Sequence, residues 1–385
     1  MIRLRVAIAT AALAATLVAP AAAQDDIRQS KYHDYRVVTV ADGFQIPWGM
    51  VFLPDGDMLV SERPGDIRIV RDGRILPQPV SGVPEVLAEG QGGLLDLTLH
   101  PDFSANRLLY MSYSKPYENE EGATTAIARA RYEDGALHDF EELFVADSRG
   151  RGHYGSRIVF DGAGHVFFSV GDRQAPSRGD LEAHPAQDRS NHHGTINRIY
   201  EDGRVPEDNP FIGTAGVEPS IWSYGHRNPQ GMVFDVESGR LWATEHGPQG
   251  GDELNLVLPG ENYGWPVVGY GVNYGSGSTI HEGTMREGWQ NPAFVWVPSI
   301  GTSGLELYTG GQFREWQGDL FAGGLSGQVL YRFEMDGDDV VDHETLLTGI
   351  GRIRDVAQGP DGYIYVALER RDGETSRIVR LEPIG

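Results

Sequence analysis

Residues Phe52-Leu-Pro-Asp-Gly-Asp-Met-Leu-Val-Ser61 run from an apolar pair through an Asp-Gly turn into an alternating apolar segment. An Asp-Gly turn flanked by such segments predicts a β-hairpin. Five later stretches follow the same plan, and they start at His100, Phe160, Phe234, Phe313 and Gly359. Six hairpins at intervals of 46 to 79 residues predict an all-β fold, a six-bladed β-propeller. A β-sandwich or tandem β domains are the alternatives.

The composition agrees with many short strands and tight turns. Glycine accounts for 51 of the 385 residues, which favours turns over long helices. Further alternating runs follow several hairpins, and they begin at Ile67, Ile127, Val329 and Ile378. The absence of cysteine excludes disulfides, a thiolate nucleophile and a thiolate metal site.

The N-terminus has the three parts of a secretory signal peptide. Arg3 and Arg5 precede an Ala-, Leu- and Val-rich segment that ends in Ala21-Ala-Ala23. We expect cleavage after residue 23, which leaves residues 24–385 as a single catalytic propeller domain without a membrane span, periplasmic or secreted. A membrane anchor is the alternative, but the apolar segment is short for one.

The chain is strongly acidic, with 32 basic and 55 acidic residues and a net charge of −23. Loss of Arg3 and Arg5 with the signal peptide would leave −25 (30 − 55). Such a charge disfavours nucleic acid and anionic lipid as partners, and it suits solubility and the binding of cations.

Three loops between residues 224 and 266 have the composition of a ligand site. They are Tyr224-Gly-His-Arg-Asn-Pro-Gln-Gly-Met232, Glu245-His-Gly-Pro-Gln-Gly-Gly-Asp-Glu-Leu-Asn255 and Glu261-Asn-Tyr-Gly-Trp-Pro266. These short loops combine turn formers, carbonyl donors, a cation and carboxylates. Such a combination suits a site that binds an anionic ligand together with a hard cation. The successive carbonyls of Gly247 and Pro248 are donors that Ca²⁺ accepts, with Asp252 and Glu253 nearby, although Gly-Pro alone is typical of an ordinary turn.

Several arginines add to this pattern. Arg352 and Arg354 are two residues apart in a predicted strand, so their side chains point to the same face. Two guanidiniums on one face repel each other unless an anion binds to both. Arg227 is a third arginine that could bind the same anion. A solvated strand face with a local partner such as Asp355 is the alternative.

His153 is the candidate general base, because a histidine has the pKa that proton transfer near neutral pH requires. It lies where a Gly-rich loop enters a predicted strand. Gln91 precedes a glycine pair that brings the backbone close to another group. Taken alone, His153 is more typical of a structural or surface histidine, and the glycine pair is more typical of a turn that leads into a buried strand.

These motifs occur in one order and together resemble the soluble quinoprotein glucose and aldose sugar dehydrogenases. The resemblance runs from about Asp42 to the C-terminus. Besides the three loops it includes Gln91-Gly-Gly-Leu-Leu-Asp96, His100-Pro-Asp-Phe103, His153-Tyr-Gly-Ser-Arg157 and Arg352-Ile-Arg-Asp-Val356. It implies a six-bladed propeller that holds pyrroloquinoline quinone (PQQ) and Ca²⁺.

The resemblance also implies a role for each site residue. His153 and Arg227 would be catalytic, and Gln91 would face the sugar. Arg227, Asn228, Arg352 and Arg354 would hold PQQ. The carbonyls of Gly247 and Pro248 would bind the catalytic Ca²⁺, and Glu253 with the Tyr263 carbonyl a second, structural Ca²⁺.

The implied reaction oxidises the anomeric hydroxyl of an aldose to a lactone, with an unidentified periplasmic electron acceptor, in what we expect to be a monomer. Two positions depart from the glucose enzymes. Ser326 replaces a lysine that would contact the quinone, and Gly152 replaces an acidic residue before the base. Both departures favour the aldose sugar dehydrogenase branch. A Ca²⁺-dependent lactonase and a non-catalytic carbohydrate- or protein-binding propeller are the alternatives.

Overall fold

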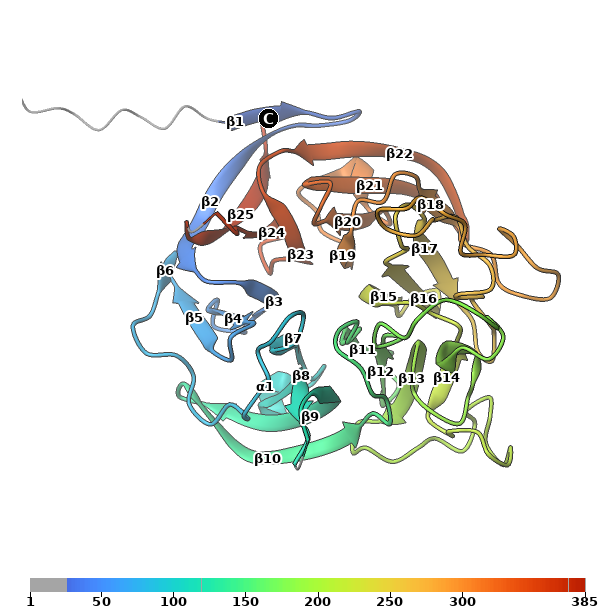
Figure 1. Cartoon of the computed structure of the whole chain (residues 1–385). Helices are drawn as coiled ribbons and strands as arrows, with labels where there is room; N and C mark the ends of the chain where they lie inside the picture. Colours follow the sequence, from blue (N-terminus) through green and yellow to red (C-terminus); the bar gives the residue numbers. More distant parts are fainter. Residues whose placement is uncertain (1–25, 119, 373, 385) are drawn as a thin grey trace, which may run out of the picture.

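The computed structural model describes residues 26–118, 120–372 and 374–384, so the predicted signal peptide lies outside the described residues. Six antiparallel sheets stand around a central axis (Figure 1). The prediction of an all-β, six-bladed propeller is confirmed. In the described part of the chain, no helix has the length and apolar character needed to cross a membrane.

Five of the sheets are continuous in sequence. They are β3 (Pro47–Phe52), β4 (Met58–Glu62), β5 (Ile67–Arg71) and β6 (Arg74–Ile75); β7 (Leu94–Leu99), β8 (Leu108–Pro116), β9 (Ala123–Glu133) and β10 (Ala136–Val145); β11 (Ile158–Phe160), β12 (His165–Val170), β13 (Thr195–Tyr200) and β14 (Ile221–Tyr224); β15 (Pro229–Asp235), β16 (Arg240–Glu245), β17 (Asp252–Val257) and β18 (Phe294–Trp296); and β19 (Thr302–Leu307), β20 (Leu320–Gly324), β21 (Val329–Asp336) and β22 (Asp339–Thr348).

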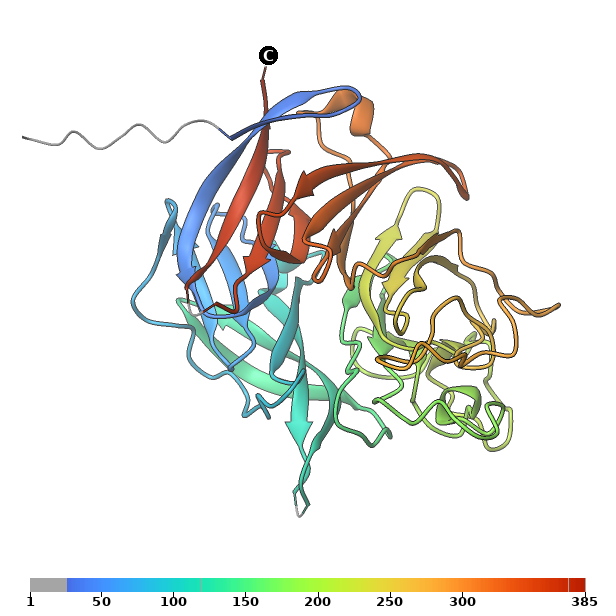
Figure 2. The ribbon, with the colours of Figure 1, turned by 45° about the horizontal axis from the view of Figure 1, so that its top comes forward.

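The sixth sheet joins the two ends of the described chain. Its order is β1 (Asp26–Gln29), β2 (Asp34–Phe44), β25 (Ser376–Pro383), β24 (Ile364–Glu369) and β23 (Arg352–Gln358). Strand β2 pairs with β25 from Tyr35↔Pro383 to Phe44↔Ser376. Two views show this pairing closing the ring (Figures 1 and 2). The only helices among the described residues are short: α1 (Phe103–Asn106) and two 3₁₀ turns, Pro185–Gln187 and Arg314–Trp316.

Each predicted hairpin connects the strand nearest the axis with the next strand of its sheet. In the first sheet Phe52 pairs with Met58 across the Asp-Gly turn, where Gly56 has a φ of 93° that favours glycine. In the last sheet Gln358 pairs with Ile364. The further alternating runs form third strands, β5, β9, β21 and β25. The sequence pattern therefore located three strands in several of the blades.

The first strand of each continuous sheet and β23 of the sixth sheet lie next to the axis (Figure 1). Close approach of these strands requires small residues: a side chain at Gly49 would place its Cβ 2.9 Å from Asp96 Oδ1, and one at Gly304 2.5 Å from Asp355 Oδ1. The buried Arg157 guanidinium lies 2.9 Å from Asp96 and 3.0 Å from Asp355. One cation thus ties the inner strands of three blades.

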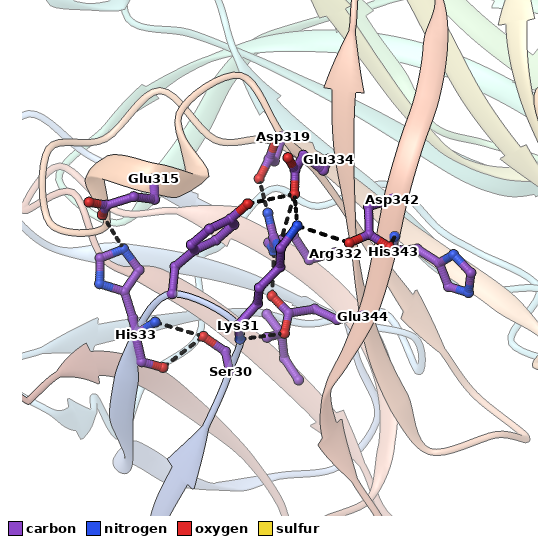
Figure 3. Close-up of polar contacts among 12 residues, drawn as sticks. Ser30, Lys31, His33, Glu315, Asp319, Arg332, Glu334, Asp342, His343 and Glu344 are labelled. Carbon is purple, nitrogen blue, oxygen red and sulfur yellow. Dashed lines mark hydrogen bonds and ion pairs between the residues drawn. The ribbon is translucent and has the colours of Figure 1, made fainter.

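A polar network fastens the turn between β1 and β2 to the neighbouring blade (Figure 3). The Lys31 ammonium lies 2.8 Å from Glu334, and its backbone N–H donates to Glu344 at 2.8 Å. Behind it, the fully buried Arg332 contacts Asp319 and donates to Glu344 at 2.7 Å. The exposed and the buried ion pairs lie side by side but should differ greatly in their effect on stability.

We expect Asp319→Ala to lower the free energy of unfolding by about 3 kcal/mol, because it leaves a buried guanidinium without one of its partners. Lys31→Ala, which removes an exposed cation from the same network, should leave the urea midpoint unchanged within error. Urea unfolding followed by circular dichroism measures both. Equal effects of the two substitutions would contradict the assignment.

Candidate active site

Loops on one face of the ring enclose a cavity of about 670 Å³. Its lining includes Gln91, His153, Asp172, Gln174, Arg178, Arg227, His246, Pro248, Trp265 and Tyr274. The cavity therefore brings together the histidine, the glutamine, one of the arginines and the Gly-Pro turn that the sequence singled out from distant segments.

His153 and Asp172 form a buried pair at the wall of this cavity. His153 Nδ1 lies 2.5 Å from Asp172 Oδ1, and the two residues are 6% and 1% exposed. The backbone N–H of Gln174 donates to Oδ1 at 2.9 Å, and the Trp265 indole N–H donates to Oδ2 at 2.7 Å. Because the carboxylate is fixed on both oxygens, it holds the imidazole with Nδ1 protonated and leaves Nε2 as the ring nitrogen that can accept a proton.

The electrostatics favour a neutral histidine beside an ionised carboxylate. Burial lowers the pKa of His153, and the Arg227 charge lowers it further, although Asp172 acts in the opposite direction. Burial alone would raise the pKa of Asp172, but the contact with His153 and the charge of Arg227 outweigh it, so the pKa lies below its usual range. His153 is therefore available as a proton acceptor at neutral pH.

Gln91 supports the backbone at His153 and also lines the cavity. Its side-chain oxygen accepts the His153 backbone N–H at 2.7 Å, which supports the positive φ of 44° at His153. The Gln91 amide nitrogen remains for a ligand, so its contact with sugar stays a prediction. The Gln174 carboxamide occupies the space beside Gly152: a Cβ at Gly152 would lie 2.6 Å from it, so a side chain there would require the Gln174 side chain to move.

Arg227 lies between the histidine and the Gly-Pro turn. Its guanidinium donates to the carbonyls of His246, at 3.2 Å, and Gly247, at 2.8 Å, and packs 5.1 Å from the centre of the Trp265 ring. Its Nε is buried and has no partner among the described residues. The Nδ2 atom of the adjacent, fully buried Asn228 also has none. Two unpaired donors at consecutive positions suit an acceptor-rich ligand.

Asp252 holds the Gly-Pro turn in place by accepting hydrogen bonds from the backbone. Asp252 accepts N–H groups from Gly247, at 2.9 Å, and from Ile300, Gly301 and Thr302, at 2.6 to 3.1 Å. A side chain at Gly247 would collide with Gly251, since a Cβ would lie 2.1 Å from that carbonyl. The Asp252 carboxylate therefore fixes two loops through four backbone N–H groups.

Glu253 and Tyr263 meet at a second, much smaller cavity of about 20 Å³, which Glu245 also lines. This volume holds about one water-sized species. Burial and the nearby Glu245 charge raise the pKa of Glu253 well above its usual range. The Tyr263 carbonyl accepts no hydrogen bond in the described part of the chain. A buried carboxylate (Glu245), a partly buried one (Glu253) and an unpaired carbonyl around one small space suit a hard cation.

Arg352 and Arg354 share an anion within the protein. Both donate to Glu369, at 3.3 Å and at 2.6 Å, and Arg371 also contacts this buried carboxylate. Burial opposes ionisation of Glu369, but Arg354 and Arg371 overcome it and lower its pKa to about 2. The alternative in which Asp355 is their local partner is wrong, since Asp355 faces the axis and pairs with Arg157.

A model of the Glucose / Sorbosone dehydrogenase family matches residues 44–380. The chain belongs to this family. It is 40% identical over 351 residues to aldose sugar dehydrogenase YliI of Escherichia coli, covering 89% of this chain and 92% of that protein. The crystal structure of the E. coli soluble aldose sugar dehydrogenase in its apo form superimposes with a TM-score of 0.82 at 37% identity, over 91% of this chain and all of that one.

A further relative of the dehydrogenase family was solved with PQQ bound. This aldose sugar dehydrogenase from Streptomyces coelicolor is 30% identical, with a TM-score of 0.73, and the match covers 90% of this chain and 97% of that one. The resemblance to quinoprotein sugar dehydrogenases that the motifs indicated is therefore confirmed.

Three residues of the dehydrogenase site were missed in the sequence. Asp172, Trp265 and Glu369 hold the predicted histidine and arginines, yet none was assigned a role. A signal existed for Asp172 and Glu369, because each lies at or just beyond the end of the second strand of a repeat, as does the motif that begins at Glu245. Trp265 lies within a quoted motif, but only the tertiary structure shows its bond to Asp172.

We expect Asp172→Asn to lower the pKa of His153 further, because the carboxylate charge favours the protonated imidazole. A pH titration of the apo protein by ¹H–¹⁵N NMR of the imidazole measures this pKa. Asp336→Asn removes an exposed carboxylate elsewhere and should leave the His153 titration unchanged. A raised pKa in Asp172→Asn would show that the two side chains do not interact as described.

Proposed function

We propose that the protein is a PQQ- and Ca²⁺-dependent aldose sugar dehydrogenase that oxidises the anomeric hydroxyl of aldoses to lactones. The observation that carries the proposal is the buried His153–Asp172 pair, which opens on a cavity shared with Arg227. The named relatives, an aldose sugar dehydrogenase and a PQQ-bound enzyme, support the same reaction.

The residues present fit PQQ, a quinone with three carboxylates. Arg227 and Asn228 offer buried donors without partners, and Arg352 and Arg354 line an adjoining cavity. Planar guanidinium groups bind carboxylates with paired, charge-assisted hydrogen bonds. When bound, PQQ would supply the two-electron oxidation by accepting a hydride from the sugar carbon.

The protein's own groups would control the proton. His153 Nε2 would accept the proton of the anomeric hydroxyl, and Asp172 would stabilise the resulting imidazolium through Nδ1–H. Arg227, within the same cavity, would favour negative charge that develops nearby. Gln91 would orient the sugar, since its amide nitrogen is not used by His153.

Two Ca²⁺ sites would complete the enzyme. The Gly247 and Pro248 carbonyls would bind the catalytic ion; Gly247 O already accepts a bond from Arg227, and a carbonyl keeps a second lone pair for a metal. Glu253 and the Tyr263 carbonyl would bind a structural ion. Among the described residues no three acidic or histidine side chains are grouped to hold a metal, which agrees with sites that depend on main-chain oxygens.

Cleavage after residue 23 would deliver residues 24–385 as a single periplasmic or secreted catalytic domain. We infer a monomer that passes electrons to a periplasmic acceptor. A lactonase would need no cluster of arginines beside the catalytic cavity, and a non-catalytic binding propeller would need no buried histidine–carboxylate pair. The dehydrogenase uses both features.

The deciding experiment adds PQQ and Ca²⁺ to the EDTA-treated mature protein and follows dye reduction with a panel of aldoses. Activity that requires both additions supports the dehydrogenase and ranks its sugars. Hydrolysis of a lactone with Ca²⁺ alone, without dye reduction, would favour the lactonase instead.

We expect His153→Ala to bind PQQ normally but to lower turnover by a factor of about 10² or more, because the proton acceptor is lost. Steady-state dye reduction gives the rate, and a PQQ titration gives the affinity. Wild-type turnover in this variant would overturn the assignment of the base.

We expect Glu253→Gln to reduce the bound calcium from about two ions per chain to about one, because a neutral amide replaces an anionic ligand. Metal analysis after gel filtration counts the ions. Glu261→Gln, a matched change of a nearby glutamate outside the small cavity, should retain both. Loss of both ions or of neither in Glu253→Gln would contradict a separate structural site.

A further inference from the structure

Beside the catalytic cavity lies a smaller cavity of about 200 Å³ whose walls are strongly cationic. It is not the 20 Å³ cavity at Glu253. Gln91 and His246 line both spaces, so the two adjoin. Four arginines line the smaller space: Arg63, Arg352, Arg354 and Arg371. No carboxylate lines it, which is unusual in a chain of net charge −23.

The internal anion behind this wall does not balance it. Glu369 contacts Arg352, Arg354 and Arg371, and it is the only carboxylate that pairs with any of the four arginines among the described residues. Four positive charges and one negative charge leave +3 around the cavity (4 − 1). Like charges gathered in a partly buried space are destabilising unless a further anion joins them.

Arg63 is the arginine of this group with no partner of its own. Its guanidinium makes no hydrogen bond or ion pair in the part of the chain that the structure describes, although the side chain is half-buried. Burial lowers its pKa, and the charge of Arg354 lowers it further. A partly buried guanidinium without a partner gains free energy when a carboxylate joins it, and its planar donors suit that group.

The backbone at Arg63 is nevertheless held firmly. Its N–H donates to the Ile46 carbonyl at 2.9 Å, and its carbonyl accepts the Leu94 N–H at 3.1 Å. Gly93 lies directly against it: a Cβ there would be 1.9 Å from the Arg63 carbonyl oxygen, and Gly93 has a φ of 142°. The glycine pair after Gln91 thus allows the loop that supports His153 to pack against the residue that carries the free guanidinium.

We propose that Arg63, together with Arg371, forms a carboxylate-binding subsite for PQQ in the smaller cavity. The inference rests on the proposed function. The two cavities adjoin at Gln91 and His246, so a ligand that spans both would meet this cationic wall. Arg63 can offer all its donors, and Arg371 uses only one side of its guanidinium for Glu369.

The test is a PQQ titration of the mature, EDTA-treated protein in the presence of Ca²⁺ and without sugar, followed by calorimetry. Loss of one charge-assisted contact should raise the Kd of Arg63→Gln at least about tenfold. Arg63→Lys, which keeps the charge, should lose less affinity. Arg74→Gln removes an exposed arginine outside both cavities and should bind as the wild type does.

A second measurement separates a direct contact from a general loss of charge. Salt should weaken the binding of PQQ to the wild type more steeply than to Arg63→Gln, because the variant has one ion pair fewer to screen. Thermal unfolding of the apo proteins checks folding. We expect the melting temperature of Arg63→Gln to be no lower than that of the wild type, because the Arg63 side chain makes no hydrogen bond or ion pair among the described residues and its removal relieves like-charge repulsion.

An unchanged Kd in Arg63→Gln, with a melting temperature no lower than that of the wild type, would overturn the subsite while leaving the dehydrogenase proposal intact. If the wild type itself binds no PQQ, the proposed function fails and the subsite fails with it. If Arg74→Gln lost as much affinity for PQQ as Arg63→Gln, the effect would come from the net charge of the protein, which would also refute the subsite.

Discussion

The pairing of β2 with β25 is the contact on which the site depends, because it closes the ring and fixes six inner strands around one axis. Gln91 precedes β7, His153 precedes β11 and Arg227 precedes β15, each at the entry to an inner strand. In the blades that contain β11 and β15, the chain leaves the second strands, β12 and β16, just before Asp172 and His246 respectively. Since the two strands are antiparallel, these entries and exits reach the same face.

Closure also explains how an acidic protein maintains a cationic site. Arginines that are far apart in the sequence converge because equivalent positions of the repeats point at one space. The protein's own carboxylates limit the repulsion: Glu369 holds three guanidiniums, while Arg157 is neutralised at the axis by Asp96 and Asp355. The axial pairs are structural, and the incomplete neutralisation at Glu369 is what leaves charge for a ligand.

The fold could be predicted from the sequence because short, continuous segments of the chain determine it. Each Asp-Gly or equivalent turn specifies a hairpin, and the repetition specifies the number of blades. His153 and Arg227 were also recognisable, since their motifs are short and continuous. The pairing of His153 with Asp172 was not, because it depends on which loops the closed ring brings together. The alternative in which Asp355 is the local partner of the neighbouring arginines failed for the same reason: Asp355 pairs with Arg157, which lies in another blade.

The ring also changes what the substitution at Ser326 means. Ser326 follows Leu325, which lines the smaller cavity just beyond the end of β20. Arg63 just beyond β4 and Arg371 beyond β24 occupy comparable positions in two other blades and line the same cavity. A cation removed from one blade can therefore be supplied from another without any movement of the backbone. We therefore infer that the charge available to an anionic ligand depends on several blades together, and not on the residue at position 326 alone.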